Sequence, residues 1–154
     1  MKITVSILFV AITACSFSKK TISQKEKIDA TISMEKTPCY GRCPNYAITI
    51  YGDGKAEFLG KRFVDSIGTF EKYFSIEDVK SLVKAFEEAN FFGLQDEYTA
   101  RVSDMSTVYV SFTQNGKTKK IKDYYNAPEL LKQLEKMIEK MAFSTGWKRI
   151  EPQK

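Results

Sequence analysis

The amino-acid sequence predicts an α+β fold in which hairpins build an antiparallel sheet and two helices pack on one face of it. Alternating apolar and polar residues flank the turn sequences Asp53-Gly54 and Asn115-Gly116, which is typical of β-hairpins. Two longer stretches, around residues 76–90 and 129–141, space their apolar residues as helices do. The order along the chain is strands, a helix, a hairpin and a second helix, which favours antiparallel pairing.

Length and composition indicate one globular domain, expected over residues 30–147 with a C-terminal tail at 148–154. The chain has 154 residues, of which 43% are hydrophobic and 28% charged, and these values are ordinary for a folded domain. The formal net charge is +5, but acids are interleaved among the lysines. Binding to nucleic acid needs basic charge concentrated on one surface, so the sequence predicts no nucleic-acid partner.

Residues 1–14 predict a lipoprotein signal peptide. Lys2 precedes an apolar run from Ile3 to Ala14, whose helix would span about 18 Å, well short of the roughly 30 Å hydrocarbon core of a bilayer. The run therefore indicates an export signal. Its end, Ile12-Thr13-Ala14-Cys15, resembles the lipobox of bacterial lipoproteins, which implies cleavage before Cys15 and acylation of that cysteine. The alternative is an ordinary cleavable signal in which the cysteine is incidental.

Residues 15–29 predict the lipidated cysteine followed by a flexible tether. The segment is polar and charged, and fully extended it reaches about 45 Å from the bilayer. Ser16 rather than an aspartate follows the cysteine, and no acidic run follows. By resemblance to Gram-negative lipoproteins, this pattern implies the outer membrane and its periplasmic face. We therefore expect a cell-envelope protein that contacts the membrane through its lipid anchor.

Residues 30–37 are expected to form a strand. The next two strands are expected to form a hairpin over residues 45–60. A two-residue loop at its turn would mix apolar and polar side chains on each face. A three-residue loop with Gly54 in the left-handed conformation instead sets Ile50 opposite Ala56 and keeps one face apolar. We expect the three-residue loop, because a buried face specifies register strongly.

Two further features complete the sheet. A strand is expected at residues 68–74. The second hairpin has Asn115-Gly116 at its turn, a pair that favours a two-residue loop. This register sets Val110 opposite Ile121 on the inner face.

Both helices carry recognisable start signals. Ser75 is followed three residues later by an acid, which predicts a capped helix from Ile76 to near Asn90. Asn126 is expected to cap the last helix, with Pro128 in its first turn. The apolar stripe expected on this last helix consists of Leu130, Leu134, Ile138 and Met141.

The segment TPCYGRCPNY places Cys39 and Cys43 four positions apart between two prolines, with Gly41 expected to supply a permissive backbone between them. A disulfide is favoured, because the envelope is oxidising and acylation of Cys15 leaves an even pair. Redox and metal roles are the alternatives. However, a strand rather than a helix follows the motif, and two thiolates are too few for a structural zinc site. The chain has no histidine, which excludes Ser-His-Asp and Cys-His catalysis, and we predict no metal, cofactor or catalytic residue.

Several short motifs lie close together in this chain: Thr37-Pro38-Cys39, Gly41, Cys43-Pro44, Tyr46 and Ile50-Tyr51-Gly52-Asp53-Gly54. They resemble the signature of an uncharacterised bacterial family, the domain of unknown function 6438. The later stretches Asp96-Glu97-Tyr98 and Asp123-Tyr124-Tyr125-Asn126-Ala127-Pro128 look like its other shared segments, so the resemblance spans residues 32–147. It implies export and frequent lipidation, but it implies no activity.

Loop residues are the remaining candidates for a binding site. They are the two residues inside the cysteine loop and the acids and tyrosines of later loops: Tyr40, Arg42, Asp96, Glu97, Tyr98, Asp104, Asp123, Tyr124 and Tyr125. One interpretation gathers them into a cation or glycan site, and the plainer one has the acids cap turns while the tyrosines half-bury beside the sheet. We therefore predict a lipid-anchored, non-catalytic binding or structural module with a protein or glycan partner. The alternative is a thiol-disulfide or carboxylate-based envelope enzyme.

Overall fold

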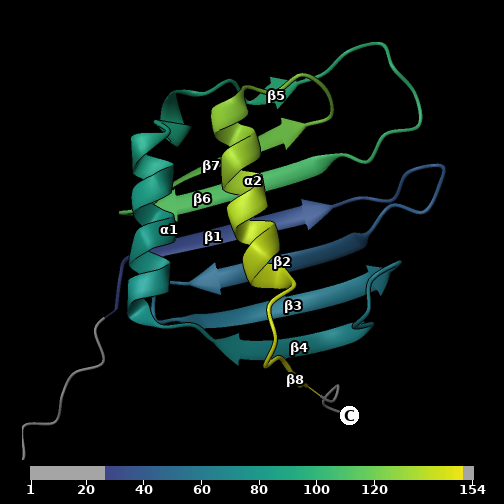
Figure 1. The fold of residues 1–154 in the computed structure, drawn as a ribbon. Coiled ribbons are helices and arrows are strands. Elements are labelled where there is room, and N and C mark those ends of the chain that lie inside the picture. The colour runs from purple at the N-terminus through teal and green to yellow at the C-terminus, as the bar shows by residue number, and fades with distance from the viewer. Residues whose placement is uncertain (1–26, 151–154) are drawn as a thin grey trace, which may run out of the picture.

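The structure, a computed structural model, describes residues 27–150 (Figure 1). Its elements are β1 (Ala30–Lys36), β2 (Asn45–Tyr51), β3 (Lys55–Arg62), β4 (Gly68–Tyr73), α1 (Ile76–Glu88), the 3-10 helix η1 (Phe91–Gly93), β5 (Glu97–Tyr98), β6 (Val108–Gln114), β7 (Lys117–Asp123), α2 (Glu129–Ala142) and β8 (Lys148–Arg149). The predicted signal peptide, Cys15 and most of the tether lie outside the described residues. Within those residues, no helix is both long and apolar enough to span a bilayer.

The strands of the described region form one eight-stranded sheet in the order β5-β7-β6-β1-β2-β3-β4-β8. Neighbouring strands are antiparallel except β5 and β7, which are parallel. Figure 1 shows both α-helices on the same face of this sheet. The predicted α+β fold is therefore confirmed.

Side chains along the central strands alternate between the helix-covered face and the open face. Ile32 and Ile48 are buried beneath the helices, whereas their strand neighbours are only half-buried. Under α1, Phe86 lies 4.9 Å from both Phe91 and Phe112, measured between ring centroids. A second aromatic cluster covers the β3 side of the sheet and joins Tyr46, Phe58, Phe143 and Trp147.

The first hairpin has the predicted register. Ile50 pairs with Ala56, and three residues connect the strands. Gly54 has a φ of 88°, and a Cβ added there would lie 2.6 Å from the carbonyl oxygen of Phe74. Glycine is therefore required at this position for both its conformation and its lack of a side chain.

The second hairpin is also confirmed. Val110 pairs with Ile121, and the two-residue loop has positive φ at both Asn115 (51°) and Gly116 (72°). Positive φ at both central residues is the geometry that Asn-Gly favours, and its twist matches that of the flanking strands.

The first helix is confirmed by its cap. The Ser75 Oγ accepts a hydrogen bond from the backbone N–H of Asp78 at 3.1 Å. The helix ends at Glu88, and its buried residues follow one stripe: Val79, Leu82, Val83 and Phe86. The chain then turns at Asn90, which has a φ of 48°, into η1.

The last helix is confirmed, and so are the Leu134 and Ile138 positions of its stripe, but the predicted cap and the two ends of the stripe are wrong. Asn126 has a φ of 60°, and a capping residue instead needs an extended backbone, which Pro128 adopts. Leu130 is consequently 50% exposed and Met141 is only half-buried. The buried stripe begins one residue later and contains Leu131, Leu134, Glu135, Ile138 and Ala142.

Contacts of the folded domain continue slightly beyond residues 30–147 at both ends. Ile28 donates a backbone hydrogen bond to Gly52 at 2.9 Å, and a Cβ on Gly52 would lie only 1.7 Å from the Ile28 oxygen. The chain therefore passes directly over Gly52 before β1. At the other end, Lys148 and Arg149, in the expected tail, pair with β4. Two-residue strands such as β5 and β8 are too short to show a period in the sequence.

Candidate functional site

The candidate site consists of the loops at the end of the sheet opposite Ile28. β1, β3 and β7 run toward this end and β2, β4 and β6 run away from it, because these neighbours are antiparallel. The loops at residues 37–44, 63–67, 99–107 and 124–128 therefore lie together, at the right of Figure 1. We call these four segments the distal loops.

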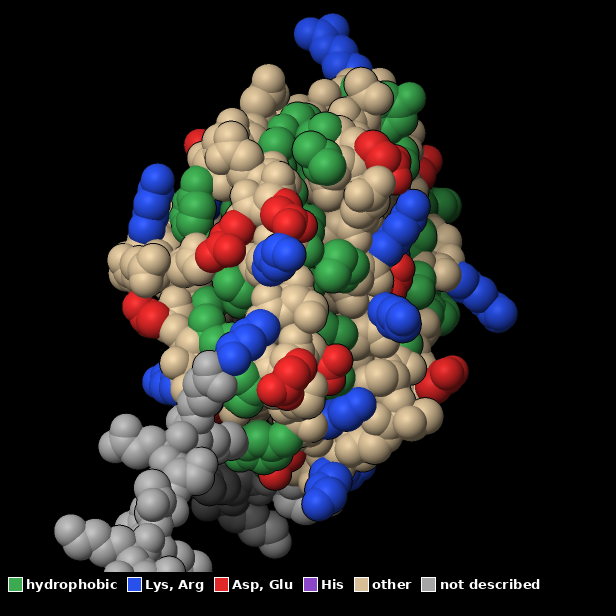
Figure 2. All heavy atoms as spheres, turned by 60° about the vertical axis from the view of Figure 1, so that its left-hand side comes forward, with side chains coloured by type: hydrophobic (Ala, Val, Ile, Leu, Met, Phe, Trp, Pro, Cys, Tyr) green, Lys and Arg blue, Asp and Glu red, His purple; other side chains and the backbone are tan. Residues whose placement is uncertain are grey.

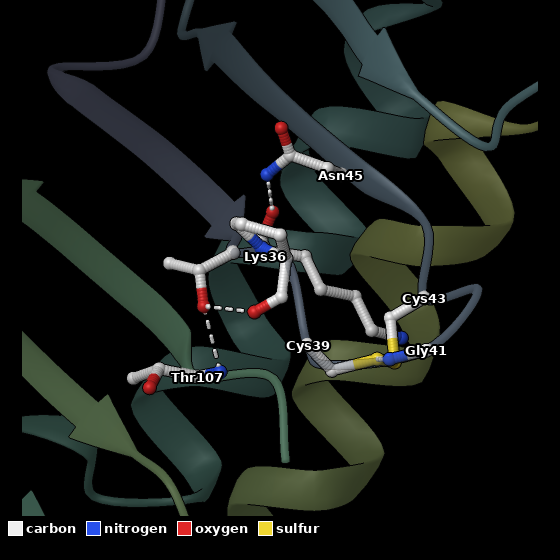
Figure 3. The surroundings of a disulfide bond; sticks show 8 residues. Lys36, Cys39, Gly41, Cys43, Asn45 and Thr107 are labelled. Atoms are coloured by element: carbon white, nitrogen blue, oxygen red, sulfur yellow. Dashed lines mark hydrogen bonds between the residues drawn. A yellow bond between two sulfur atoms is a disulfide. The ribbon is translucent and has the colours of Figure 1, made fainter. Parts of the chain in front are cut away.

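A disulfide between Cys39 and Cys43 closes the first distal loop (Figure 3). Their Cα atoms are 5.6 Å apart, within the range that a disulfide bridges, and the Gly41 N–H donates to the Cys39 Sγ at 3.2 Å. Gly41 is not among the residues with positive φ, and a Cβ there would meet only the Cys39 Sγ, at an ordinary 3.9 Å. The expected need for a glycine is wrong. The bond itself restricts the loop.

Hydrogen bonds tie both ends of this loop to neighbouring segments. The Thr37 N–H donates to the Thr107 carbonyl at 2.9 Å, and the Thr107 N–H donates to the Thr37 Oγ1 at 2.8 Å. Across the base of the loop, the Asn45 side-chain amide donates to the Lys36 carbonyl at 2.7 Å (Figure 3). The first distal loop is thus fixed at its base and closed by a covalent bond at its tip.

Exposed apolar side chains gather in the distal loops. Tyr40 is 92% exposed, and Phe63 has a φ of 55°, a conformation that bulky residues rarely adopt. Of the eleven exposed large hydrophobic residues in the described region, six lie in these loops: Tyr40, Phe63, Ile67, Val102, Met105 and Tyr125. Apolar residues exposed together on the loops of a rigid scaffold are typical of binding surfaces.

The acids at the start of β5, Asp96 just before the strand and Glu97 within it, do not contribute to this surface. Asp96 pairs with Lys119 and Glu97 pairs with Lys122, each at 2.7 Å. Both pairs hold the short β5 against β7. These two acids therefore form ion pairs between neighbouring segments, which neither interpretation of the sequence predicted.

The predicted tyrosines and Asp104 lie in or beside the distal loops. The Tyr98 Oη accepts a hydrogen bond from the Gln95 N–H at 3.1 Å, and its ring is half-buried against the core. The Tyr124 Oη donates to the Val102 carbonyl at 2.8 Å, which joins two distal loops. Asp104 is exposed, with a φ of 70°. Within the predicted set, the residues that lie inside the distal loops are Tyr40, Arg42, Asp104, Tyr124 and Tyr125, whereas Tyr98 and Asp123 end the strands that lead into them.

Asp123 has a different environment from the one its sequence position suggests. It ends β7 beneath α2, its side chain is 1% exposed, and its carboxylate pairs with Lys132. The Lys132 ammonium also contacts Glu135 at 3.2 Å. Burial, reinforced by the neighbouring Asp123, raises the pKa of Glu135 to about 7. One buried cluster therefore connects the end of β7 to α2, next to the distal loop at residues 124–128.

Sequence reasoning missed Glu135, although a signal was present. The residue lies between Leu131 and Ile138 on the face of α2 that packs against the sheet. A charged residue inside an apolar stripe is rarely buried without a partner. The burial of Glu135 follows only from a stripe that begins at Leu131. In a stripe that begins at Leu130, Glu135 lies outside the apolar face and looks solvent-exposed.

One helical turn further, Glu139 forms a second polar group. It accepts hydrogen bonds from the Lys36 Nζ at 3.2 Å and from the Tyr46 Oη at 3.1 Å. Burial, with the adjacent Glu139, raises the pKa of the Tyr46 phenol above its ordinary value. The hollow between these residues and Glu135 has a volume of about 160 Å³. This hollow is smaller than the roughly 300 Å³ of the smallest typical ligand pockets. The contacts of Glu139 with Lys36 and Tyr46 therefore have a structural role, which is to fix α2 on the sheet.

The sequence model of one family, the domain of unknown function DUF6438, matches residues 30–142. The chain belongs to this family. The DUF6438 match begins at the first residue of β1 and ends at the last residue of α2. It therefore includes all four distal loops and the buried Asp123 cluster, and it leaves β8 outside. No curated protein matches the chain.

Proposed function

We propose that the protein is a lipid-anchored, non-catalytic binding module of the cell envelope that recognises a protein partner through the distal loops. The observation that carries the proposal is Tyr40, which is 92% exposed on a loop closed by a disulfide. A rigid loop loses little conformational entropy on binding, so an exposed aromatic residue on it is suited to anchor a partner.

The position of the loops supports the same proposal. The chain enters the domain at Ile28, and β1 leads directly from there to the loop at residues 37–44 (Figure 1). A tether from Cys15 would therefore attach the domain at one end and leave the distal loops at the other, away from the outer membrane and toward the periplasm.

The buried carboxylates support a non-catalytic role. A glycosidase holds two carboxyl groups roughly 5–9 Å apart across a cleft that admits the sugar. Asp123 and Glu135 instead contact the same ammonium group beneath α2, and they are 2% and 9% exposed. A substrate would have to displace the helix to reach both.

Site-specific photo-crosslinking in the intact envelope tests this proposal. A photoreactive phenylalanine analogue replaces Tyr40 in one full-length variant, and Glu77, exposed at the start of α1, in a matched control. We expect a protein adduct of defined mass from position 40 that is absent from position 77. Identical adducts at both positions, or none at position 40, would contradict recognition through the distal loops.

A further inference from the structure

A groove runs between α1 and α2 on the helix-covered face. At one end it has a volume of about 400 Å³ and is lined by both helices and by β4. A second hollow of about 160 Å³ continues it, and Met137 lines both. Figure 2 looks onto the α1 side of the molecule, where hydrophobic side chains reach the surface between charged ones.

The side chains along the groove explain its apolar character. α1 contributes small residues, Ser81 and Ala85, which leave space between the helices. On α2, Leu130 and Met137 lie two turns apart and are 50% and 37% exposed. The lining ends at Ser144, just beyond α2, so the groove is about 21 Å long at 1.5 Å per residue. Apolar side chains form its floor and part of its walls, and polar or charged residues such as Ser81 and Gln133 stand among them.

One end of the groove is positively charged. The Lys72 Nζ donates to the Ser144 Oγ at 2.8 Å and to the Thr145 carbonyl at 2.7 Å, and Lys140 lies one turn before Ser144. Neither ammonium forms an ion pair with any carboxylate of the described region. The acid in the lining of this end, Asp78, accepts a hydrogen bond from Ser75 at 2.7 Å, and the other acid of the groove, Glu88, lines the opposite end. The Lys72 Nζ also lies 4.5 Å from the centroid of the Phe74 ring. An anionic group at this end would complement two ammonium groups that have no ion pair.

We propose that this groove binds a free long-chain fatty acid, with the acyl chain along Met137 and the carboxylate at Lys72 and Lys140. The wider part is within the volume range of ligand pockets. A lipid tail spans about 15 Å, half of a bilayer's roughly 30 Å hydrocarbon core, so the groove of about 21 Å holds the chain and its head group. This inference does not depend on the distal loops.

Methionine suits this ligand. Its unbranched thioether side chain adapts to irregular apolar contacts, so the two methionines of the lining, Met137 and Met141, can follow a flexible acyl chain. Because the side chain of Met137 is partly exposed, its replacement tests binding with little disturbance of the core.

A fluorescence titration tests the apolar part of the site. The full chain carrying Cys15→Ser is titrated with a dansylated undecanoic acid, and palmitate is then added as competitor. We expect saturable binding that palmitate displaces, and at least a tenfold loss of affinity in Met137→Glu. Met105→Glu, at an exposed methionine of a distal loop, is the matched control and keeps the affinity. Circular dichroism verifies folding, and Met137→Gln replaces Met137→Glu if that variant is unfolded.

The charged end is tested by head-group chemistry. Lys140→Glu is expected to weaken palmitate binding about tenfold and to leave hexadecanol, which lacks the carboxylate, unaffected. Lys120→Glu, on the open face of the sheet, is the control and changes neither. The proposal is overturned if binding does not saturate, if Met137→Glu binds like the wild type, or if Lys140→Glu weakens the acid and the alcohol equally.

Discussion

Two glycines that the sequence predicts to supply a special backbone have different structural roles. Gly54 follows an aspartate in the first turn, where its φ is 88° and the Phe74 oxygen leaves no room for a Cβ. Gly41 lies between two cysteines, where the sequence predicts a special backbone, yet its surroundings admit a side chain. The sequence shows that a glycine is present but does not show whether the fold requires it.

We therefore expect Gly54→Ala and Gly41→Ala to differ in stability. The left-handed conformation alone costs an alanine roughly 1–2 kcal/mol, and the clash with Phe74 adds to this. Gly41→Ala should change the free energy of unfolding by less than about 0.5 kcal/mol. Urea denaturation of both variants measures the difference, and an equal loss in the two would contradict the account of these turns.

Glu135 makes stability depend on pH. Its pKa rises from an ordinary 4.5 to about 7 because the folded protein buries it beside Asp123. The folded state therefore holds this proton more tightly than the unfolded state, so the contribution to stability is complete below about pH 4.5 and is lost as the pH rises toward 7. At about 1.4 kcal/mol per pH unit, the loss is of the order of 3 kcal/mol.

The variant Glu135→Gln tests this dependence. A glutamine resembles the protonated acid, so we expect its Tm to stay level between pH 5 and pH 7.5 in buffers where the wild-type Tm falls by several degrees. Glu88→Gln, at an exposed position of α1, serves as the control and should follow the wild type. Parallel pH profiles for wild type and Glu135→Gln would exclude Glu135 as the titrating group.

At the scale of elements, α2 shows where a sequence pattern is ambiguous. Leu130 and Leu131 are adjacent, and either can begin a stripe that continues through Leu134 and Ile138. The structure buries Leu131 completely and leaves Leu130 half exposed. We expect Leu131→Ala to cost about 2–5 kcal/mol and Leu130→Ala less than about 1 kcal/mol in denaturant unfolding. A reversed order would mean that the helix faces the sheet differently.

The hairpins were predictable for a physical reason that does not apply to α2. The Asn115-Gly116 pair by itself favours a two-residue turn. In the hairpin at Gly54, only one strand register places all the apolar side chains on one face of the sheet. The two-residue strands β5 and β8 and the contact of Asp123 with α2 depend on tertiary packing between distant segments. Within the candidate site, the sequence therefore indicated Tyr40, Arg42 and the disulfide, but it missed Glu135 in the buried cluster beside the site.

The disulfide provides a test that separates binding from redox chemistry. Closing a loop this short contributes only about 2 kcal/mol by chain entropy, which suffices to hold one loop. A structural bond should have a reduction potential below about −300 mV when equilibrated against dithiothreitol. A value between about −120 and −200 mV would instead favour the thiol-disulfide alternative. The contact that supports this alternative is the hydrogen bond from the Gly41 N–H to the Cys39 Sγ.

At the scale of the whole molecule, the proposed roles have separate locations. The predicted tether would join at Ile28, the distal loops lie at the opposite end of the sheet, and the groove proposed to bind a fatty acid lies between the helices (Figure 1). The open face of the sheet is half-buried and polar, with residues such as Ser33, Thr49 and Ser111 at its centre. This separation means that variants at one site should leave the others unaffected.

The claim on which the proposed orientation depends is that Cys15 carries the lipid that holds the domain on the membrane. Metabolic labelling with a radioactive fatty acid, followed by separation of membrane and soluble fractions, tests it most directly. We predict that the wild-type chain incorporates label and stays with the outer membrane, and that Cys15→Ser incorporates none. Label retained by Cys15→Ser, or wild-type protein found unlabelled in the soluble fraction, would contradict the anchor.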